Sequence, residues 1–280
     1  MTIICKDLDF DFHQFSGGER HVQIHTKPNN LKNFLSVRAD IHSSNDLIDL
    51  LLFADAVSYL YGRQRVIDLY VPYLPYSRQD RVCAPGQSYA LNVLVGLVSN
   101  VEFKSIKTLD VHNPKCSAFE WSGEIENISQ HEYFNTKKII PKNKKIAIIQ
   151  PDDGAQDRAA GRFRGMNEYD CTIVAFKKTR DPKNGHIVFS DMEKEEVEDV
   201  DGRACYIFDD ICDGGMTFIL IAKMLKMAGA KSVHLIVSHG IFSNGLDVFD
   251  GLIDEIYCSD SFQKESKGIL TVINKQGRKL

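Results

Sequence analysis

The chain has 280 residues, with 34 Lys and Arg against 38 Asp and Glu, and a formal net charge of −4. Hydrophobic residues make up 43% of the chain and charged residues 26%, a composition that is typical of globular proteins and excludes a disordered chain. The slightly negative charge offers no electrostatic attraction to nucleic acids or membrane surfaces, so we expect neither as a partner. At roughly 150 residues per domain, the length predicts two modest domains or one large one.

The sequence shows no signal for export or for membrane insertion. Its first residues contain no basic segment followed by a long apolar run, so we expect no signal peptide. No apolar stretch approaches the roughly 18 residues that a membrane-spanning helix needs. The seven cysteines contain no CxxC pair and indicate free thiols in a reducing compartment. We therefore expect a soluble, cytoplasmic protein.

Short apolar runs alternate with longer amphipathic segments along the whole chain. The continuous apolar character of the runs predicts parallel strands that are covered on both faces. Asn45 is a suitable N-cap for the first helix, and Gly229 a suitable glycine after the last one. In chain order, the predicted elements are a strand at Val22–Ile24, a helix at Asn45–Tyr61, a strand at Arg65–Val71, a helix at Ser88–Ser99, strands at Ser105–Leu109 and Lys145–Ile149, a helix at Ala155–Arg164, strands at Cys171–Phe176 and Ala204–Phe208, a helix at Thr217–Ala228 and a strand at Ser232–Val237. In the first helix, the apolar residues at helical spacing are Leu47, Ile48, Leu51 and Leu52.

This alternation predicts an α/β fold with two tandem, doubly wound domains and parallel sheets. A polar, lysine-rich segment at 135–145 precedes IAIIQPDDG, which has the pattern of a new first strand. We therefore assign residues 1–140 to an N-terminal domain and residues 141–280 to a C-terminal domain. The acidic segment Lys183–Gly202 predicts an exposed hairpin or mobile flap, with a short strand at His186–Phe189.

The strongest functional signal is Tyr206–Thr217, which reads YIFDDICDGGMT. An apolar strand leads into two adjacent acids, Asp209 and Asp210, then a third acid, two glycines and the start of a helix. Backbone N–H groups at a helix N-terminus bind anions, and glycines let a phosphate approach the backbone closely. The two carboxylates would repel a phosphate but can accept hydrogen bonds from a ribose diol. The structural alternative is an acidic turn with a glycine cap.

This segment resembles the loop that binds phosphoribosyl diphosphate (PRPP) in type I phosphoribosyltransferases and in PRPP synthetases, also called ribose-phosphate diphosphokinases. Five further segments resemble motifs of the synthetases, and all six occur in the family's order across nearly the whole chain. We therefore identify the sequence as resembling a divergent, short member of the PRPP synthetase family. The five segments are Phe15–Glu19 (FSGGE), Tyr76–Arg81 (YSRQDR), Asp110–His112 (DVH), Pro151–Gly154 (PDDG) and Ser238–Ser243 (SHGIFS).

The resemblance implies a role for individual residues. ATP-binding residues are implied to be Phe15, Glu19, Arg78, Gln79, Asp80 and His112. Residues that bind the ribose phosphate are implied to be Asp209, Asp210, Asp213, Gly214, Gly215, Met216 and Thr217. A Mg²⁺ ion is implied to lie between His112 and Asp152, on the ATP phosphates. Lys178 and Arg180 resemble the K-x-R of the family's flexible catalytic loop, where cations stabilise charge on the reacting phosphorus.

Each of these side chains also has a purely structural interpretation. Arg78 beside Asp80 is typical of a surface ion pair, and a lone histidine such as His112 is usually an ordinary loop residue. Lys178 and Arg180 lie in a run of charged residues, which is also typical of a solvated surface segment without a functional role. Segment Ser238–Ser243 is as typical of a packed strand terminus as of a ribose pocket.

The sequence departs from the family's pattern at three places. Gly17 stands where an Asp or Asn usually meets the adenine. Residues 82–85, VCAP, replace a longer basic stretch that contributes to regulation, so control by ADP or phosphate is in doubt. The phosphate loop usually reads D-T-[CG]-G-T but here reads DGGMT, from Asp213 to Thr217. One hydroxyl donor is therefore lost and a larger side chain enters the loop.

Three functions remain open. The first is transfer of the β,γ-diphosphate of ATP to the anomeric hydroxyl of ribose 5-phosphate, which gives PRPP and AMP; a variant of it uses a larger acceptor such as ADP-ribose. The second is a type I phosphoribosyltransferase, which consumes PRPP. The third is a catalytically silent regulatory partner. The resemblance also implies that Phe15–Glu19 completes the ATP site of a neighbouring subunit, so we expect a homo-oligomer.

Overall fold

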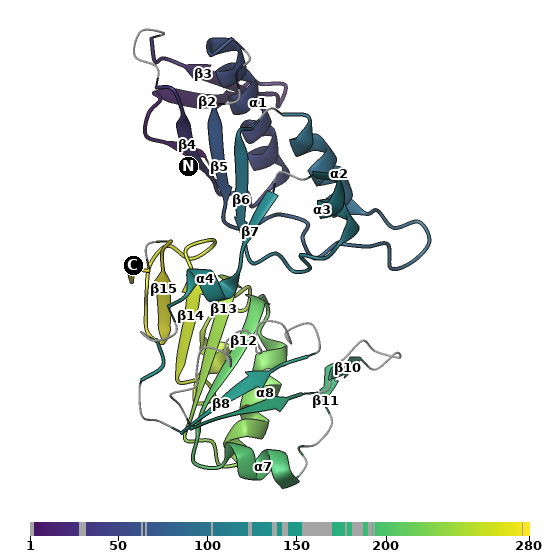
Figure 1. Cartoon of the computed structure of the whole chain (residues 1–280), viewed down its shortest axis with the longest axis vertical. Helices are drawn as coiled ribbons and strands as arrows, with labels where there is room; N and C mark the ends of the chain where they lie inside the picture. The colour runs from purple at the N-terminus through teal and green to yellow at the C-terminus, as the bar shows by residue number, and fades with distance from the viewer. Residues whose placement is uncertain are drawn as a thin grey trace. The chain divides into compact units, whose positions relative to one another are not determined.

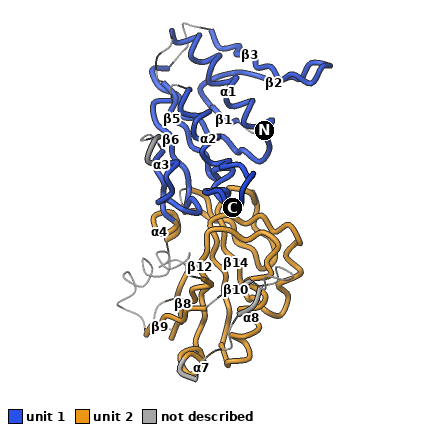
Figure 2. The backbone as a smooth tube through the Cα atoms, turned by 90° about the vertical axis from the view of Figure 1, so that its right-hand side faces the viewer, with its two compact units in different colours: residues 1–129 blue, residues 130–280 orange. Residues whose placement is uncertain are grey.

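The computed structural model describes residues 3–27, 32–62, 64, 66–101, 103–122, 125–135, 139–141, 145–152, 170–176, 178–180, 187–189, 192, 194–275 and 277–280. The chain divides into two compact units, Met1–Ser129 and Gln130–Leu280 (Figure 2). The short helix α4 (Gln130–Tyr133) belongs to the second unit, because its Gln130 side chain donates to the backbone carbonyl of Asp209. The predicted domain limits, 1–140 and 141–280, stay a prediction.

The sheet of the first unit has five strands in the order β1-β4-β5-β6-β7 (Figure 1). Strands β4 to β7 run parallel, and β1 pairs with β4 in the antiparallel direction at one edge. Helices α1 (Ser44–Leu60) and α2 (Ala90–Ser99) contribute apolar side chains to the same core as the strands, and α3 (Ser117–Ser122) follows β6. The strands are β1 (Ile3–Cys5), β4 (Leu35–Ala39), β5 (Ile67–Val71), β6 (Ser105–Leu109) and β7 (Ile125–Ile128).

A separate antiparallel ribbon is formed by β2 (Phe10–Gln14) and β3 (Arg20–Ile24). The guanidinium of Arg20 donates from Nε and Nη2 to the two carboxylate oxygens of Asp49 on α1, at 2.8 and 2.5 Å. The Phe10 ring lies 4.8 Å from the ring of Phe53, which is fully buried. A bidentate ion pair and an aromatic contact therefore attach the ribbon to α1.

The predicted N-cap of the first helix is wrong by two residues. Ser43 caps α1: its hydroxyl accepts from the backbone N–H of Asp46, whose carboxylate accepts in return from the Ser43 N–H at 2.7 Å. This reciprocal pair is a capping box, and it places Asn45 inside the first turn. The predicted apolar face is also shifted, because Ile48 is exposed. The buried residues of α1 are Leu47, Asp49, Leu50, Phe53, Ala54 and Val57.

The second unit contains a parallel sheet of six strands in the order β15-β14-β13-β12-β8-β9. Helix α8 (Met216–Met227) packs along one face of this sheet (Figure 1). The remaining elements are α7 (Lys194–Val200), the 3-10 helix η3 (Asp247–Phe249), and the antiparallel pair β10 (Lys178–Arg180) and β11 (Ile187–Phe189). The strands are β8 (Lys145–Gln150), β9 (Asp170–Ala175), β12 (Ala204–Cys212), β13 (Ser232–Gly240), β14 (Glu255–Ser259) and β15 (Leu270–Ile273).

The predicted α/β class with parallel sheets is confirmed, and each of the predicted strands coincides with a strand of the structure. Strands β12 and β13 continue beyond their predicted ends because their ladder extends to the pair Cys212 and Gly240. The expected glycine at the end of α8 is confirmed, since Gly229 has a φ of 85°. The predicted helix Ala155–Arg164 lies outside the described residues. In the described part of the chain, no helix has the length and apolar character needed to cross a membrane.

We expect Ser43→Ala to lower the free energy of unfolding of the first unit by roughly 0.5–2 kcal/mol, because it removes the acceptor for the Asp46 N–H. Asn45→Ala is the matched control: within the first helical turn, alanine is at least as good a helix former as asparagine. Urea denaturation followed by circular dichroism measures both values. A larger loss in Asn45→Ala than in Ser43→Ala would restore Asn45 as the cap.

Candidate functional site

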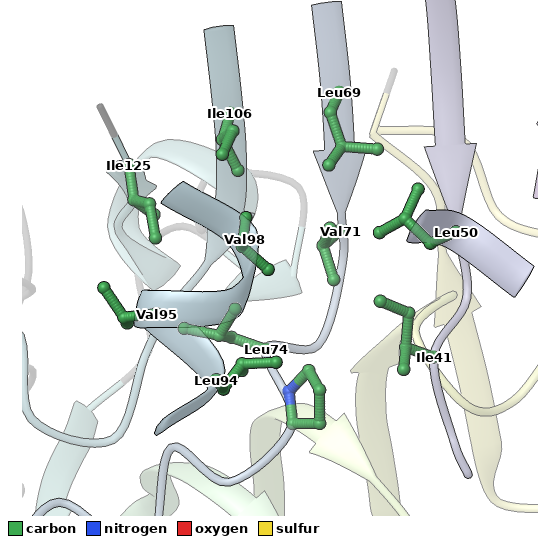
Figure 3. A pocket seen from close by; sticks show the side chains of 11 residues that line it. Ile41, Leu50, Leu69, Val71, Leu74, Leu94, Val95, Val98, Ile106 and Ile125 are labelled. Atoms are coloured by element: carbon green, nitrogen blue, oxygen red, sulfur yellow. The ribbon is translucent and has the colours of Figure 1, made fainter. Parts of the chain in front are cut away.

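The apolar hollow in the first unit is a packing gap. Its volume is about 10 Å³, enough for a single water at most. Figure 3 shows apolar side chains from the sheet and from α1 and α2 surrounding it, among them Leu69, Ile106, Leu94 and Val98. With no polar group in its lining, this hollow cannot bind a phosphorylated ligand. Candidate functional residues are found instead at the ends of the strands.

In the second unit, the carboxyl ends of β8, β12, β13 and β14 lie at one edge of the sheet because all four strands are parallel. The register aligns Ile207 of β12 with Ile149 of β8, so the residues that follow both strands emerge close together. These residues are Asp152 after β8 and the acidic segment at the end of β12. The fold therefore brings two of the sequence motifs to one edge.

The junction between β12 and α8 depends on Gly215. This residue is the N-cap of α8 and has a φ of 82°, a conformation that glycine adopts without strain. A Cβ atom at this position would lie 2.5 Å from the ring of Phe249, so any side chain would also displace that ring. No side chain caps α8, and within its first turn the Phe218 N–H donates to the Gly215 carbonyl at 3.0 Å. The anion site at this junction stays a prediction.

Asp209 and Asp210 lie inside β12 rather than in the loop after it. Successive side chains of a strand point to opposite faces, and the two aspartates differ accordingly: Asp209 is half-buried, whereas Asp210 is only 4% exposed. One carboxylate oxygen of Asp209 accepts from the backbone N–H of Asp210 at 2.9 Å. Of the two, Asp209 is the more accessible to a ligand.

A buried polar network supports this edge; the motif Ser238–Ser243 contributes two of its members, and the other three were not predicted from the sequence. Gln130 donates to the carbonyl of Asp209 at 2.6 Å and to the hydroxyl of Ser238 at 3.2 Å. Ser259 donates to the carbonyl of Ser238 at 2.6 Å, and Ser261 lies 3.0 Å from Nδ1 of His239. All five side chains are buried. A polar residue at the end of a buried strand is a signal that can be read from the sequence, and both Ser238 and Ser259 have it. His239 is a packed strand terminus in this network.

The first unit shows a similar arrangement after β5 and β6. Arg78 and Gln79 follow β5 and are exposed, and His112 follows β6 and is exposed as well. The side-chain amide of Asn113 donates to the carboxylate of Asp80 at 2.7 Å, which ties the two loops together. The structure therefore brings the predicted residues Arg78, Gln79, Asp80 and His112 into one region of this unit.

Backbone strain coincides with the motifs. Among the described residues, only three non-glycine residues have positive φ angles: Tyr76 at 62°, Asp110 at 41° and Phe242 at 54°. Each lies in a segment that the sequence analysis singled out, shortly after a strand of one of the two sheets. Such conformations cost about 1–3 kcal/mol each and concentrate at functional sites. This distribution independently marks the loops after β5, β6 and β13.

The segment Phe15–Glu19 forms the tight turn between β2 and β3. The Phe15 N–H donates to the Glu19 carbonyl at 2.9 Å, and the Phe15 ring is 53% exposed beside His13 and His21. A side chain at Gly17 would meet only the flexible tip of the Glu19 carboxylate. The turn thus presents an exposed ring and a carboxylate, and Gly17 adds no side chain to it.

The remaining predicted residues lie on separate elements. Lys178 and Arg180 lie in β10, where they pair with Phe189 and Ile187 of β11. His112 belongs to the first unit and Asp152 to the second, so their shared magnesium site stays a prediction. Within the described ranges, the His, Cys, Asp and Glu side chains form no group of three or more that could hold a metal.

Cys212, the last residue of β12, is fully buried, and burial raises the pKa of its thiol well above the usual range. The same effect raises the pKa of Cys258 to about 12. Neither sulfur is a thiolate at neutral pH, so neither acts as a nucleophile there.

Comparison with known proteins adds to this geometry. Residues 122–248 match the family described as phosphoribosyl transferase domain. A ribose-phosphate pyrophosphokinase from Mycoplasmopsis pulmonis is 29% identical over 265 residues, covering 92% of this chain and 79% of the relative. One from Pyrococcus abyssi is 28% identical, covering 97% and 91%. The crystal structure of phosphoribosylpyrophosphate synthetase from Mycobacterium smegmatis superposes with a TM-score of 0.75 at 19% identity, over 95% of this chain and 86% of that one.

The second unit is thus an α/β domain of the phosphoribosyltransferase type, with its phosphate loop at the carboxyl end of a parallel strand. Similarity to the synthetase structure extends this fold over almost the whole chain. Over nearly its whole length the chain is similar to ribose-phosphate pyrophosphokinases, which are also called PRPP synthetases. The resemblance inferred from the sequence motifs is confirmed.

Proposed function

We propose that this chain transfers the β,γ-diphosphate of ATP to the anomeric hydroxyl of ribose 5-phosphate, giving PRPP and AMP. Relatives that are named ribose-phosphate pyrophosphokinase support this activity. The observation that carries it is the junction of β12 and α8, where the partly exposed carboxylate of Asp209 precedes an uncapped helix N-terminus. A phosphorylated ribose needs both features: donors for its phosphate and acceptors for its hydroxyls.

The acceptor is held by charge and by hydrogen bonds. Backbone N–H groups between Asp213 and Thr217 donate to the 5′-phosphate, and the positive end of the α8 dipole favours its charge. The carboxylates of Asp209 and Asp210 accept hydrogen bonds from the ribose hydroxyls. Met216, which is 56% exposed, lies at the rim of this loop.

The reaction is an in-line displacement at the β-phosphorus. The anomeric oxygen forms a bond to this phosphorus while the bond to the α,β-bridging oxygen breaks, AMP leaves, and the hydroxyl proton passes to solvent. Catalysis rests on positioning and on neutralising charge. Arg78 and Gln79 hold ATP, to which Phe15, Glu19 and Asp80 contribute, while Lys178 and Arg180 stabilise the charge that develops during transfer.

His112 and Asp152 are the residues proposed to hold Mg²⁺. One imidazole and one carboxylate suit this ion, which keeps most of its ligand positions for water and phosphate oxygens. Both side chains are at least partly accessible, which agrees with a role toward a ligand. When bound, the ion supplies positive charge beside the ATP phosphates.

The competing functions receive no support from these comparisons. The reported relatives carry the name of the ribose-phosphate enzyme, and nothing favours ADP-ribose as acceptor, a type I phosphoribosyltransferase or a silent partner. The chain is an enzyme of the synthetase kind. We propose the cytoplasm as its location.

Asp209→Asn removes the charge of the accessible aspartate but keeps its shape. We expect kcat/KM for ribose 5-phosphate to fall roughly 10- to 150-fold, because hydrogen bonds to a charged group contribute ~1.5–3 kcal/mol. The KM for ATP should change little, since ATP is bound by other residues. The measurement is AMP formation as a function of each substrate. The control is Asp201→Asn, which changes an exposed aspartate that precedes β12. An equal effect of Asp209→Asn on both substrates would contradict the assignment.

His112→Ala and Asp152→Ala test the metal site. Each should raise the Mg²⁺ concentration needed for half-maximal activity, by at least the roughly tenfold seen when outer-shell partners of a metal are removed. His131→Ala, an exposed histidine on α4, should leave this concentration unchanged. Wild-type Mg²⁺ dependence in both site variants would remove these residues from the site.

The proposed homo-oligomer rests on the turn Phe15–Glu19, whose exposed ring and carboxylate would serve a neighbouring subunit. We expect light scattering at assay concentrations to give at least twice the mass of one chain, and Phe15→Ala to raise the KM for ATP without affecting that for ribose 5-phosphate. A fully active monomer would refute the shared site.

A further inference from the structure

We propose that Asn244 is a positioning residue for the acceptor loop, which orients the peptide between Gly214 and Gly215. This inference rests on the proposed function and names a residue outside the sequence motifs. Nδ2 of Asn244 donates to the carbonyl oxygen of Gly214 at 3.0 Å. The neighbouring Ser243 N–H donates to the carbonyl of Asp213 at 3.2 Å. The segment after β13 therefore holds the phosphate loop at two successive carbonyls.

The orientation of the Gly214 carbonyl determines the direction of the Gly215 N–H. The described residues include no cis peptide bond, so the carbonyl of Gly214 and the N–H of Gly215 belong to one trans unit and point in opposite directions. While Asn244 holds the carbonyl, the Gly215 N–H points away from Asn244. It cannot rotate without breaking that bond. Asn244 thereby pre-orients one of the N–H groups proposed to bind the 5′-phosphate.

Two successive glycines need such external support. Glycine has the widest conformational freedom of all residues, and a flexible loop would lose more entropy when it binds a phosphate. Gly215 is restrained by its packing against the Phe249 ring. Gly214 has no comparable packing neighbour, and its carbonyl is restrained by Asn244. The amide thus completes the ordering of the loop.

The side chain of Asn244 also lies close to position 214. A Cβ atom built on Gly214 would lie 3.0 Å from Nδ2 of Asn244 and 3.9 Å from Oγ of Ser243. The first distance is closer than ordinary van der Waals contact, so even an alanine would push the amide away. Residues 214 and 244 are therefore coupled, and this coupling gives a test that a general packing role would not pass.

The first experiment compares Asn244→Asp and Asn244→Ala with wild type. Neither replacement can donate to the Gly214 carbonyl, and the alanine adds no charge. We expect KM for ribose 5-phosphate to rise roughly 5- to 15-fold, the effect of one hydrogen bond, while kcat and KM for ATP stay within about twofold. The control is Asn100→Asp, because Nδ2 of this exposed residue also donates to a glycine carbonyl, that of Gly96, at 2.8 Å. It should leave all three constants unchanged.

The second experiment uses the coupling. Gly214→Ala should raise KM for ribose 5-phosphate, as Asn244→Ala does. In the double variant, this KM should be no higher than in the single variant that has the higher KM. Unchanged KM in the Asn244 variants, additive effects in the double variant, or equal losses for both substrates would each overturn the inference. Calorimetric titration with ribose 5-phosphate makes the same comparison without turnover. Failure of the wild type to form AMP would count against the proposed function, whereas equal ribose 5-phosphate binding by wild type and Asn244→Asp would count against Asn244.

Discussion

Parallel pairing of strands is the constraint on which both units depend. Each new parallel strand must return through a crossover to the same starting edge, so all the strands end at the opposite edge. In the second unit this edge collects the residues after β8, β12, β13 and β14, and in the first unit those after β5 and β6. Motifs that lie up to a hundred residues apart in the sequence therefore face common regions. The chemistry of each unit follows from this arrangement of strand ends.

Loops that present polar groups at such an edge must be supported from beneath. A buried donor or acceptor without a partner costs free energy, so the serines and Gln130 under the β12 loop are linked to one another and to backbone carbonyls. Tyr76, Asp110 and Phe242 keep their positive φ angles because the packing around them holds the backbone in this conformation. At the end of β13, support from Ser238 and strain at Phe242 occur together, which is the usual signature of a pre-organised site.

How far the sequence could predict the fold differs between elements. Parallel strands with continuous apolar runs, such as Ile146–Ile149, were predicted from the sequence, whereas the parallel strands β4, β7, β14 and β15 were missed. The register of α1 was missed, since the segment LIDLLLFADAV is apolar on several faces and only the Ser43 capping box fixes its start. The end of β12 was also missed: its acidic residues have low strand propensity, but the ladder with β13 keeps them extended.

The candidate site, too, could be predicted from the sequence only in part. Local motifs predicted a phosphate loop and functional loops after β5 and β6, because a motif records spacing along the chain. The partners of those loops lie far away in the sequence. Asn113 and Asp80 are 33 residues apart, and Gln130 and Asp209 are 79 apart. No periodicity or spacing rule reveals such pairs, since only the folded sheet brings them together.

The phosphate loop shows why its departure from the family pattern need not abolish binding. Its donors are main-chain N–H groups, which every residue except proline supplies, so the sequence of the loop matters mainly for conformation. Glycine at position 214 removes a hydroxyl and adds freedom, but it also makes room for the amide of Asn244, thirty residues later in the chain. In the proposed site, the side chain of Asn244 orients this peptide through its hydrogen bond to the Gly214 carbonyl. The loop and the segment after β13 therefore have to be understood as one binding element, in which the identity of residue 214 depends on that of residue 244.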